Sequence, residues 1–104
     1  MAIISKKPST PKSGNDWLLY GLICRNAKGV QMTYIGITND FDARYKKHAT
    51  GKGAKFTRTF KPVVGAVIVR HLTRSEALKL ERKYKKLDAQ TKRVLVLSNI
   101  ESDL

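Results

Sequence analysis

Five polar side chains in this sequence are of the types that phosphodiester cleavage requires. They are Tyr20, Tyr34, Arg44, His48 and Glu81. That reaction needs a base to take a proton from water, a cation to stabilise charge on the phosphoryl oxygens, and a carboxylate to hold a divalent metal ion. A free phenol is a weak base at pH 7, but nearby cations make its deprotonation easier. A single carboxylate is sufficient for Mg²⁺ when water and a substrate phosphate supply the other ligands.

The spacing of these residues brings them together. Side chains alternate along a strand, so Tyr34 and Gly36 are predicted to lie on one face and Ile35 on the other. Arg44 and His48 are four residues apart and share one face of a helix. Two phenols, a guanidinium and an imidazole can thus converge.

Two strands and a helix must position this group. Residues 17–25 and 30–36 are rich in aromatic and aliphatic residues, and the NAKG sequence at 26–29 is typical of a hairpin turn. The sequence FDARYKKHAT, at 41–50, then predicts a short helix that ends at Gly51.

The second half of the chain completes the sheet and adds helices. Residues 51–62 read as a connection rich in glycine and lysine, and 63–70 as a β-branched strand. A T-x-x-E capping box opens a helix over 73–88, with apolar residues at helical spacing. Residues 89–97 predict another short helix, although their Val/Leu run is equally compatible with a strand.

These elements predict one small α+β domain with a three-stranded antiparallel sheet flanked by helices, in the order β-β-α-β-α-α. The domain is expected to span residues 16–98. Residues 1–15, rich in Lys, Ser and Pro, are expected to form a flexible basic arm, and residues 99–104 a frayed tail.

The charge of the chain predicts a polyanionic partner. Lys and Arg number 21 against 8 Asp and Glu, which gives a formal charge of +13 at pH 7. Nucleic acid is favoured over a membrane surface, because no long apolar stretch is present. The predicted contacts to the nucleic-acid backbone are Lys46, Lys47, Lys52, Lys55, Arg58 and Lys92.

Two further segments bear on binding. Phe56, between Lys55 and Arg58, is expected to offer an aromatic ring for base stacking. The GKGAKFTR segment lacks the spacing of a phosphate-binding loop, so a nucleoside triphosphate is not expected to bind. The basic residues at 82, 83, 85 and 86 form either a second patch or a solvated helix face.

The remaining observations concern the single cysteine, the N-terminus and the oligomeric state. The single Cys24 cannot form an internal disulfide and is expected to be a buried thiol. The N-terminus has neither the apolar run nor the cleavage site of a signal peptide, which favours a cytoplasmic location. The oligomeric state is not indicated by the sequence.

The candidate residues occur in an order that is typical of one nuclease family. They are Tyr20, the YIG sequence at 34–36, Arg44, His48 and Glu81. From about Trp17 to Lys92 the chain resembles the GIY-YIG family of nucleases. The segments YIGITNDFDARYKKHATGKGAKFTR and SEALKLERKYKKL most resemble the small single-domain members related to the N-terminal incision domain of the excision-repair nuclease.

The resemblance implies cleavage of one DNA strand with Mg²⁺ or Mn²⁺ as cofactor. It makes Tyr34 or Tyr20 the general base, with the other tyrosine in support. By the same resemblance Arg44 holds the scissile phosphate, His48 assists proton transfer and Glu81 ligates the metal. The sequence departs from the family pattern at Leu18-Leu19-Tyr20, which keeps only the tyrosine, and at Lys92, where many members have asparagine.

Each candidate also has a simpler interpretation. A strand tyrosine often packs on a core, His48 could be a cation at a helix end, and Glu81 could pair with Lys85 four residues on. Because all of these candidates occur together and in the order of the family, the leading hypothesis is a DNA endonuclease with little sequence specificity. Its alternatives are a catalytically weak or silent nucleic-acid-binding module on the same fold and an adaptor for an acidic protein.

Overall fold

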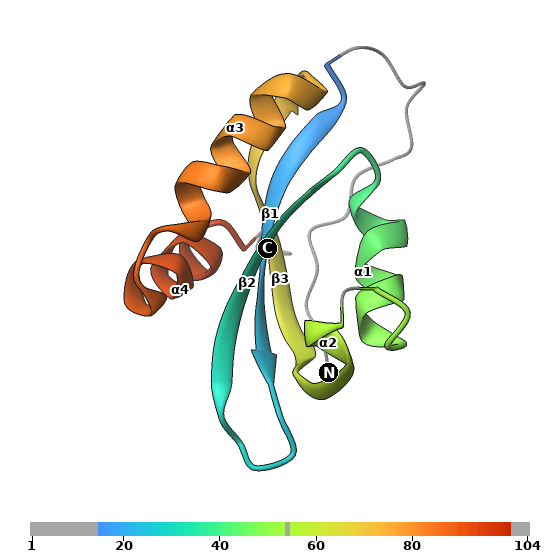
Figure 1. Ribbon diagram of the computed structural model, residues 1–104, viewed down its shortest axis with the longest axis vertical. Helices are drawn as coiled ribbons and strands as arrows, with labels where there is room; N and C mark the ends of the chain where they lie inside the picture. Colours follow the sequence, from blue (N-terminus) through green and yellow to red (C-terminus); the bar gives the residue numbers. More distant parts are fainter. Residues whose placement is uncertain (1–14, 54, 101–104) are drawn as a thin grey trace.

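Three antiparallel strands form the sheet on which the molecule is built. The computed structural model describes residues 15–53 and 55–100. In it β1 (Trp17–Arg25) lies between β2 (Gln31–Thr38) and β3 (Lys61–Leu72), so the strand order is β2-β1-β3 (Figure 1). The predicted α+β class is confirmed. The third strand is longer than the predicted 63–70.

The β1–β2 turn has the chemistry that the NAKG sequence predicts. The Asn26 side chain Oδ1 accepts hydrogen bonds from the backbone N–H groups of Lys28 (3.0 Å) and Val30 (2.9 Å). Gly29 has a φ of +83°, which glycine adopts without steric cost. The resulting register places Tyr20 directly opposite Gly36.

Two helices precede β3. Helix α1 (Phe41–Ala49) begins at the N-cap Asp40, whose side chain accepts from the backbone N–H of Ala43 at 3.2 Å. It is followed by Gly51, whose φ is +79°. Helix α2 (Phe56–Thr59) is a single turn inside the segment that was expected to be a plain connection. This helix is an addition to the predicted element order.

Two helices follow β3, and both are capped. Helix α3 (Arg74–Lys85) has the predicted capping box, since Thr73 Oγ1 accepts from the Glu76 backbone and the Glu76 carboxylate accepts from the Thr73 backbone. Helix α4 (Ala89–Ser98) begins at an aspartate N-cap. The Val/Leu run is therefore helical.

The helices lie in two groups on opposite faces of the sheet. Figure 1 shows α1 and α2 on one side and α3 and α4 on the other. The first face packs Leu18, Tyr20, Leu22 and Cys24 of β1 against α1. The second face buries the alternate residues of the sheet against α3 and α4, with Leu19, Ile23, Ile35, Ala77 and Val96 at its centre. The tyrosines of β1 and β2 thus lie on the α1 side.

The C-terminal end of the described chain is packed against the rest of the molecule. Ile100 packs against the second face, and the Asn99 side chain donates to the Leu95 carbonyl at 2.8 Å. The predicted basic arm lies outside the described residues apart from Asn15, and so do residues 101–104 of the predicted tail.

Two other features are the burial of Cys24 and the character of the helices. Cys24 is fully buried, and this burial raises the pKa of its thiol to about 12, as expected for a structural cysteine. Within residues 15–53 and 55–100, no helix has the length and apolar character needed to cross a membrane.

Candidate active site

A buried phenol and a buried imidazole form the centre of the site. Tyr20 on β1 is 1% exposed and His48 on α1 is 0% exposed, and the Tyr20 hydroxyl lies 2.8 Å from His48 Nε2. Burial, with the nearby charge of Arg44, lowers the pKa of His48 to about 4. His48 is therefore a neutral hydrogen-bond partner at pH 7 and not a charged helix-end residue.

The environment of Tyr20 opposes its ionisation. Burial raises the pKa of Tyr20 above its usual value, and a hydrogen bond from Arg44 only partly offsets this effect. The charges of Tyr34 and Glu81 raise it further. At pH 7 the Tyr20 hydroxyl keeps its proton.

The second phenol and the guanidinium lie beside this pair. Tyr34 is partly exposed on β2, and its ring centroid is 6.3 Å from that of Tyr20 and 5.1 Å from that of His48. The pKa of Arg44 is raised, mainly by its hydrogen bond to Tyr20. The charge of Tyr34 and a hydrogen bond to Tyr34 raise it further. Arg44 is thus a permanent positive charge facing both phenols.

Two glycines make room for the central pair. A Cβ atom at Gly36 would lie 2.5 Å from the Tyr20 hydroxyl oxygen. A Cβ atom at Gly53 would lie 2.6 Å from His48 Nδ1. The glycine of the YIG sequence is needed because the Tyr20 ring crosses it, and Gly53 is needed because the loop after α1 closes over the His48 ring.

Glu81 comes from the helix layer on the other side of the sheet. It lies on α3, with its side chain 23% exposed, and its charge contributes to the raised pKa of Tyr20. It also forms the expected ion pair with Lys85, at 3.4 Å between Nζ and Oε2. Glu81 therefore acts electrostatically on Tyr20 and is paired with Lys85 at the same time.

A metal ion at Glu81 would have few protein ligands. Among the described residues, no three His, Cys, Asp or Glu side chains come together as a metal site. One partly exposed carboxylate fits an ion such as Mg²⁺, which keeps several waters and shares the phosphates of its substrate. It does not fit a structural metal enclosed by protein ligands.

The predicted nucleic-acid contacts fall into two places. Five of them are exposed on α1, on α2 or in the segment between: Lys46, Lys47, Lys52, Lys55 and Arg58. Lys92 is partly buried on α4, on the opposite face of the sheet. The first five lie on or next to the helices of the tyrosine face of the sheet, whereas Lys92 lies on the other face.

The expectation for Phe56 is wrong. Its ring is stacked on Tyr34, with centroids 5.7 Å apart and an interplanar angle of 18°, and on Phe60 at 4.9 Å and 2°. Phe56 therefore belongs to the packing around the site and is not a free ring for base stacking. The signal for this arrangement was the i, i+4 pair Phe56 and Phe60, which indicates one turn of helix.

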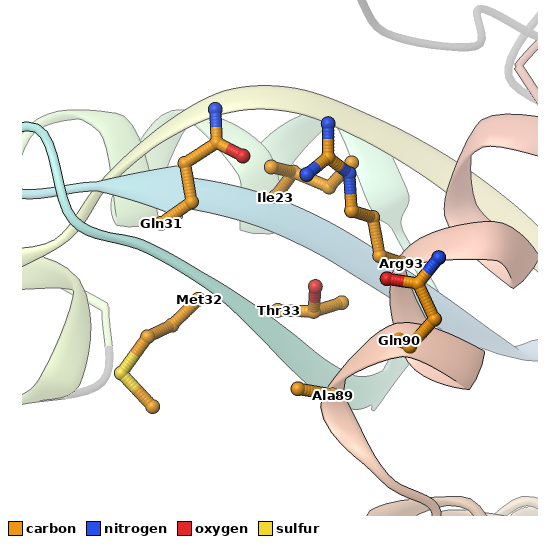
Figure 2. A pocket seen from close by; sticks show the side chains of 7 residues that line it. All are labelled: Ile23, Gln31, Met32, Thr33, Ala89, Gln90 and Arg93. Atoms are coloured by element: carbon orange, nitrogen blue, oxygen red, sulfur yellow. The ribbon is translucent and has the colours of Figure 1, made fainter.

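A pocket of about 150 Å³ lies away from the tyrosines. Figure 2 shows side chains of β2 and α4 around it, together with Ile23 of β1. Its lining residues are Ile23, Gln31, Met32, Thr33, Ala89, Gln90 and Arg93. None of the predicted site residues is among them.

The sheet order, the facing tyrosines and the Arg44 and His48 helix define the same class of protein as the sequence pattern. The chain matches the GIY-YIG catalytic domain over residues 16–93 and belongs to that family. This finding confirms the resemblance seen in the sequence and supports a nuclease-like function.

The similar proteins are small members of this family called UPF0213. One from Neisseria meningitidis serogroup C is 37% identical over 83 residues, covering 80% of this chain and 87% of its own. One from Cupriavidus necator is 43% identical over 77 residues, covering 74% and 79%. One from Bacillus velezensis is 36% identical over 78 residues, covering 75% of each. No solved structure matches this chain significantly.

Proposed function

We propose that this protein is a divalent-metal-dependent endonuclease that hydrolyses DNA phosphodiester bonds with little sequence specificity. The observation that carries the proposal is the convergence of Tyr20, Tyr34, Arg44 and His48, with the Tyr20 hydroxyl 2.8 Å from His48 Nε2. A core of purely structural aromatic residues does not need a permanent cation directed at two phenols.

Of the two tyrosines, Tyr34 is the better candidate for the general base. Its ring is partly exposed, so its hydroxyl can meet a water molecule beside a bound phosphate. The Arg44 guanidinium is hydrogen-bonded to Tyr34, so a permanent cation lies beside the proposed base. Tyr20, buried and bonded to His48, instead holds the neighbouring ring and the guanidinium in place.

Arg44 and Glu81 complete the proposed reaction. Arg44 would bind the phosphoryl oxygens, on which negative charge grows in the transition state. Glu81 would hold Mg²⁺ or Mn²⁺, and such an ion would supply further positive charge to that phosphate.

The binding of DNA is assigned to backbone contacts. The exposed cations Lys46, Lys47, Lys52, Lys55 and Arg58 lie on or next to the helices that carry the site. Contacts of this kind position a phosphate chain without reading bases, which explains the low specificity proposed here.

The experiment that tests this function uses matched substrates and variants. Purified protein is incubated with duplex, nicked, branched and single-stranded DNA and with RNA, each with Mg²⁺, Mn²⁺ or a chelator. Tyr34→Phe should slow cleavage by roughly 100- to 10,000-fold, the range for a lost general base. Tyr84→Phe is the matched control, since Tyr84 packs with the core on the α3 side of the sheet. Glu81→Gln should abolish the stimulation by metal.

The 3.4 Å ion pair between Glu81 and Lys85 favours a second candidate, a silent nucleic-acid-binding module. In that case the carboxylate serves only the helix. A wild-type protein that binds DNA but cuts no substrate with either metal would establish this alternative and end the endonuclease proposal.

A further inference from the structure

The segment after α1 covers the candidate active site. Gly53 closes over the His48 ring, and the next element, α2, places Phe56 against Tyr34. Phe56 has two stacking partners, Tyr34 on β2 and Phe60 at the end of α2. A stack of aromatic rings therefore runs from α2 to the proposed base.

Tyr34 has three aromatic neighbours, and Phe56 is unlike the other two. The rings of Tyr20 and His48 are tilted against Tyr34 at 37° and 60°. Phe56 lies nearly parallel to it, at 18°. Phe56 has no polar atom, so it can act on the base only by packing.

We propose that Phe56 is a positioning residue that holds the Tyr34 ring in the orientation needed for catalysis, a proposal that rests on the endonuclease function above. Tyr34 lies on the edge strand β2 and is partly exposed, so burial alone leaves its χ1 angle less restricted than that of a core tyrosine. A rotation about χ1 moves the hydroxyl by several ångströms. The parallel contact with Phe56 opposes that rotation.

The expected consequence is a loss of rate and not of affinity. A misplacement of about 1 Å of a reacting group can cost on the order of 100-fold in rate. Binding should be retained, because the proposed contacts to the DNA backbone, which include Lys55 and Arg58 on either side of Phe56, are not changed. Loss of Phe56 should therefore lower kcat while KM stays near its wild-type value.

The test compares Phe56→Leu with Phe56→Tyr, and with Phe60→Leu as the matched control, since Phe60 stacks on Phe56. Phe56→Leu should lower the single-turnover cleavage rate roughly 10- to 100-fold. Phe56→Tyr should restore it to within a few-fold of wild type, and Phe60→Leu should have the smaller effect. Metal-free DNA affinity should be unchanged in all three.

A double-mutant comparison separates positioning from general damage. In the Tyr34→Phe background, Phe56→Leu should cause no further loss of rate, because the hydroxyl that it positions is absent. An equal loss in both backgrounds would show that Phe56 serves only the fold. Full activity of Phe56→Leu in an otherwise wild-type protein that cleaves DNA would overturn this inference and leave the endonuclease function standing.

A second readout does not depend on cleavage. Stacking on Phe56 should shift the NMR resonances of the Tyr34 ring protons by ring current, and Phe56→Leu should remove that shift while those of Tyr84 stay unchanged. Unaltered Tyr34 resonances in Phe56→Leu would disprove the contact itself. A wild-type protein with the shift but without any cleavage would refute the endonuclease function and, with it, the catalytic role of Phe56.

Discussion

Replacing Gly36 with alanine should destabilise the fold and disrupt the site at once. The backbone of Gly36 is in a strand and its φ is not positive, so alanine meets no conformational penalty there. In a strand, glycine to alanine otherwise stabilises by roughly 0.5–1 kcal/mol, because the unfolded chain loses freedom. A loss of stability would therefore come from the contact with Tyr20.

The size of that loss follows from the distances. The new Cβ would lie 2.5, 2.6 and 3.0 Å from the Oη, Cζ and Cε1 atoms of Tyr20, so the ring must retreat. Tyr20 is 1% exposed, and its ring centroid lies 5.6 Å from that of Phe41, so the ring has little space to move into. Overpacking typically costs about 1–3 kcal/mol, and loss of the hydrogen bond to His48 about 1 more, so the expected total is roughly 2–4 kcal/mol.

The measurement is denaturant and thermal unfolding followed by circular dichroism. A loss of this size should lower Tm by about 10 to 25 °C in a domain of this length. Gly36→Ala should cost much less in a Tyr20→Leu background, because the clashing ring is gone. Gly29→Ala is a control without a steric clash. Gly29 has open space around it, so any loss of stability there should come from its φ of +83°. A Gly36→Ala protein as stable as wild type would refute the close approach of Tyr20 to β2.

Three further predictions use single residues of the α1 side. The pKa of His48 is about 4 in the folded protein and 6.5 in the unfolded chain, so between these values the unfolded chain binds one more proton. The free energy of unfolding should therefore fall by up to about 3 kcal/mol as the pH drops from 6.5 to 4. The His48→Gln variant should lack this loss when unfolding is measured as a function of pH. Tyr45→Phe should leave stability equal or raise it by about 1 kcal/mol in urea unfolding, because the buried Tyr45 hydroxyl has no hydrogen-bond partner among the described residues. Lys52→Ala and Lys55→Ala should each reduce the salt slope of DNA binding by roughly one, equally for unrelated sequences, in titrations at several ionic strengths.

The sequence was sufficient to predict the sheet and the shared face of the two tyrosines. Alternation along β2 places Tyr34 and Gly36 together, and the i, i+4 spacing places Arg44 beside His48, because both rules depend on backbone geometry alone. The T-x-x-E capping box likewise located the start of α3 correctly. These features are local, so a short window of sequence contains their cause.

The contacts that depend on tertiary packing could not be predicted in this way. The stacking of Phe56 on Tyr34 joins residues 22 positions apart, and the i, i+4 pair of Phe56 and Phe60 indicates one helical turn but not its partner on β2. The charge state of His48 was equally hidden, since its position near the end of α1 favours a cation and only burial against Tyr20 makes it neutral. In both cases the deciding neighbour comes from another element.

The proposed site draws on both faces of the sheet, and Gly36 lies at the point where Tyr20 crosses β2. The phenols lie on the α1 side of the sheet and Glu81 belongs to α3 on the other side, yet its charge acts on Tyr20. β2 is an edge strand, and Tyr20 extends across Gly36 of that strand. A larger residue at 36 would displace the phenol from this position. Gly36 therefore allows the Tyr20 phenol to occupy the position in which it bonds His48 and is affected by the charge of Glu81.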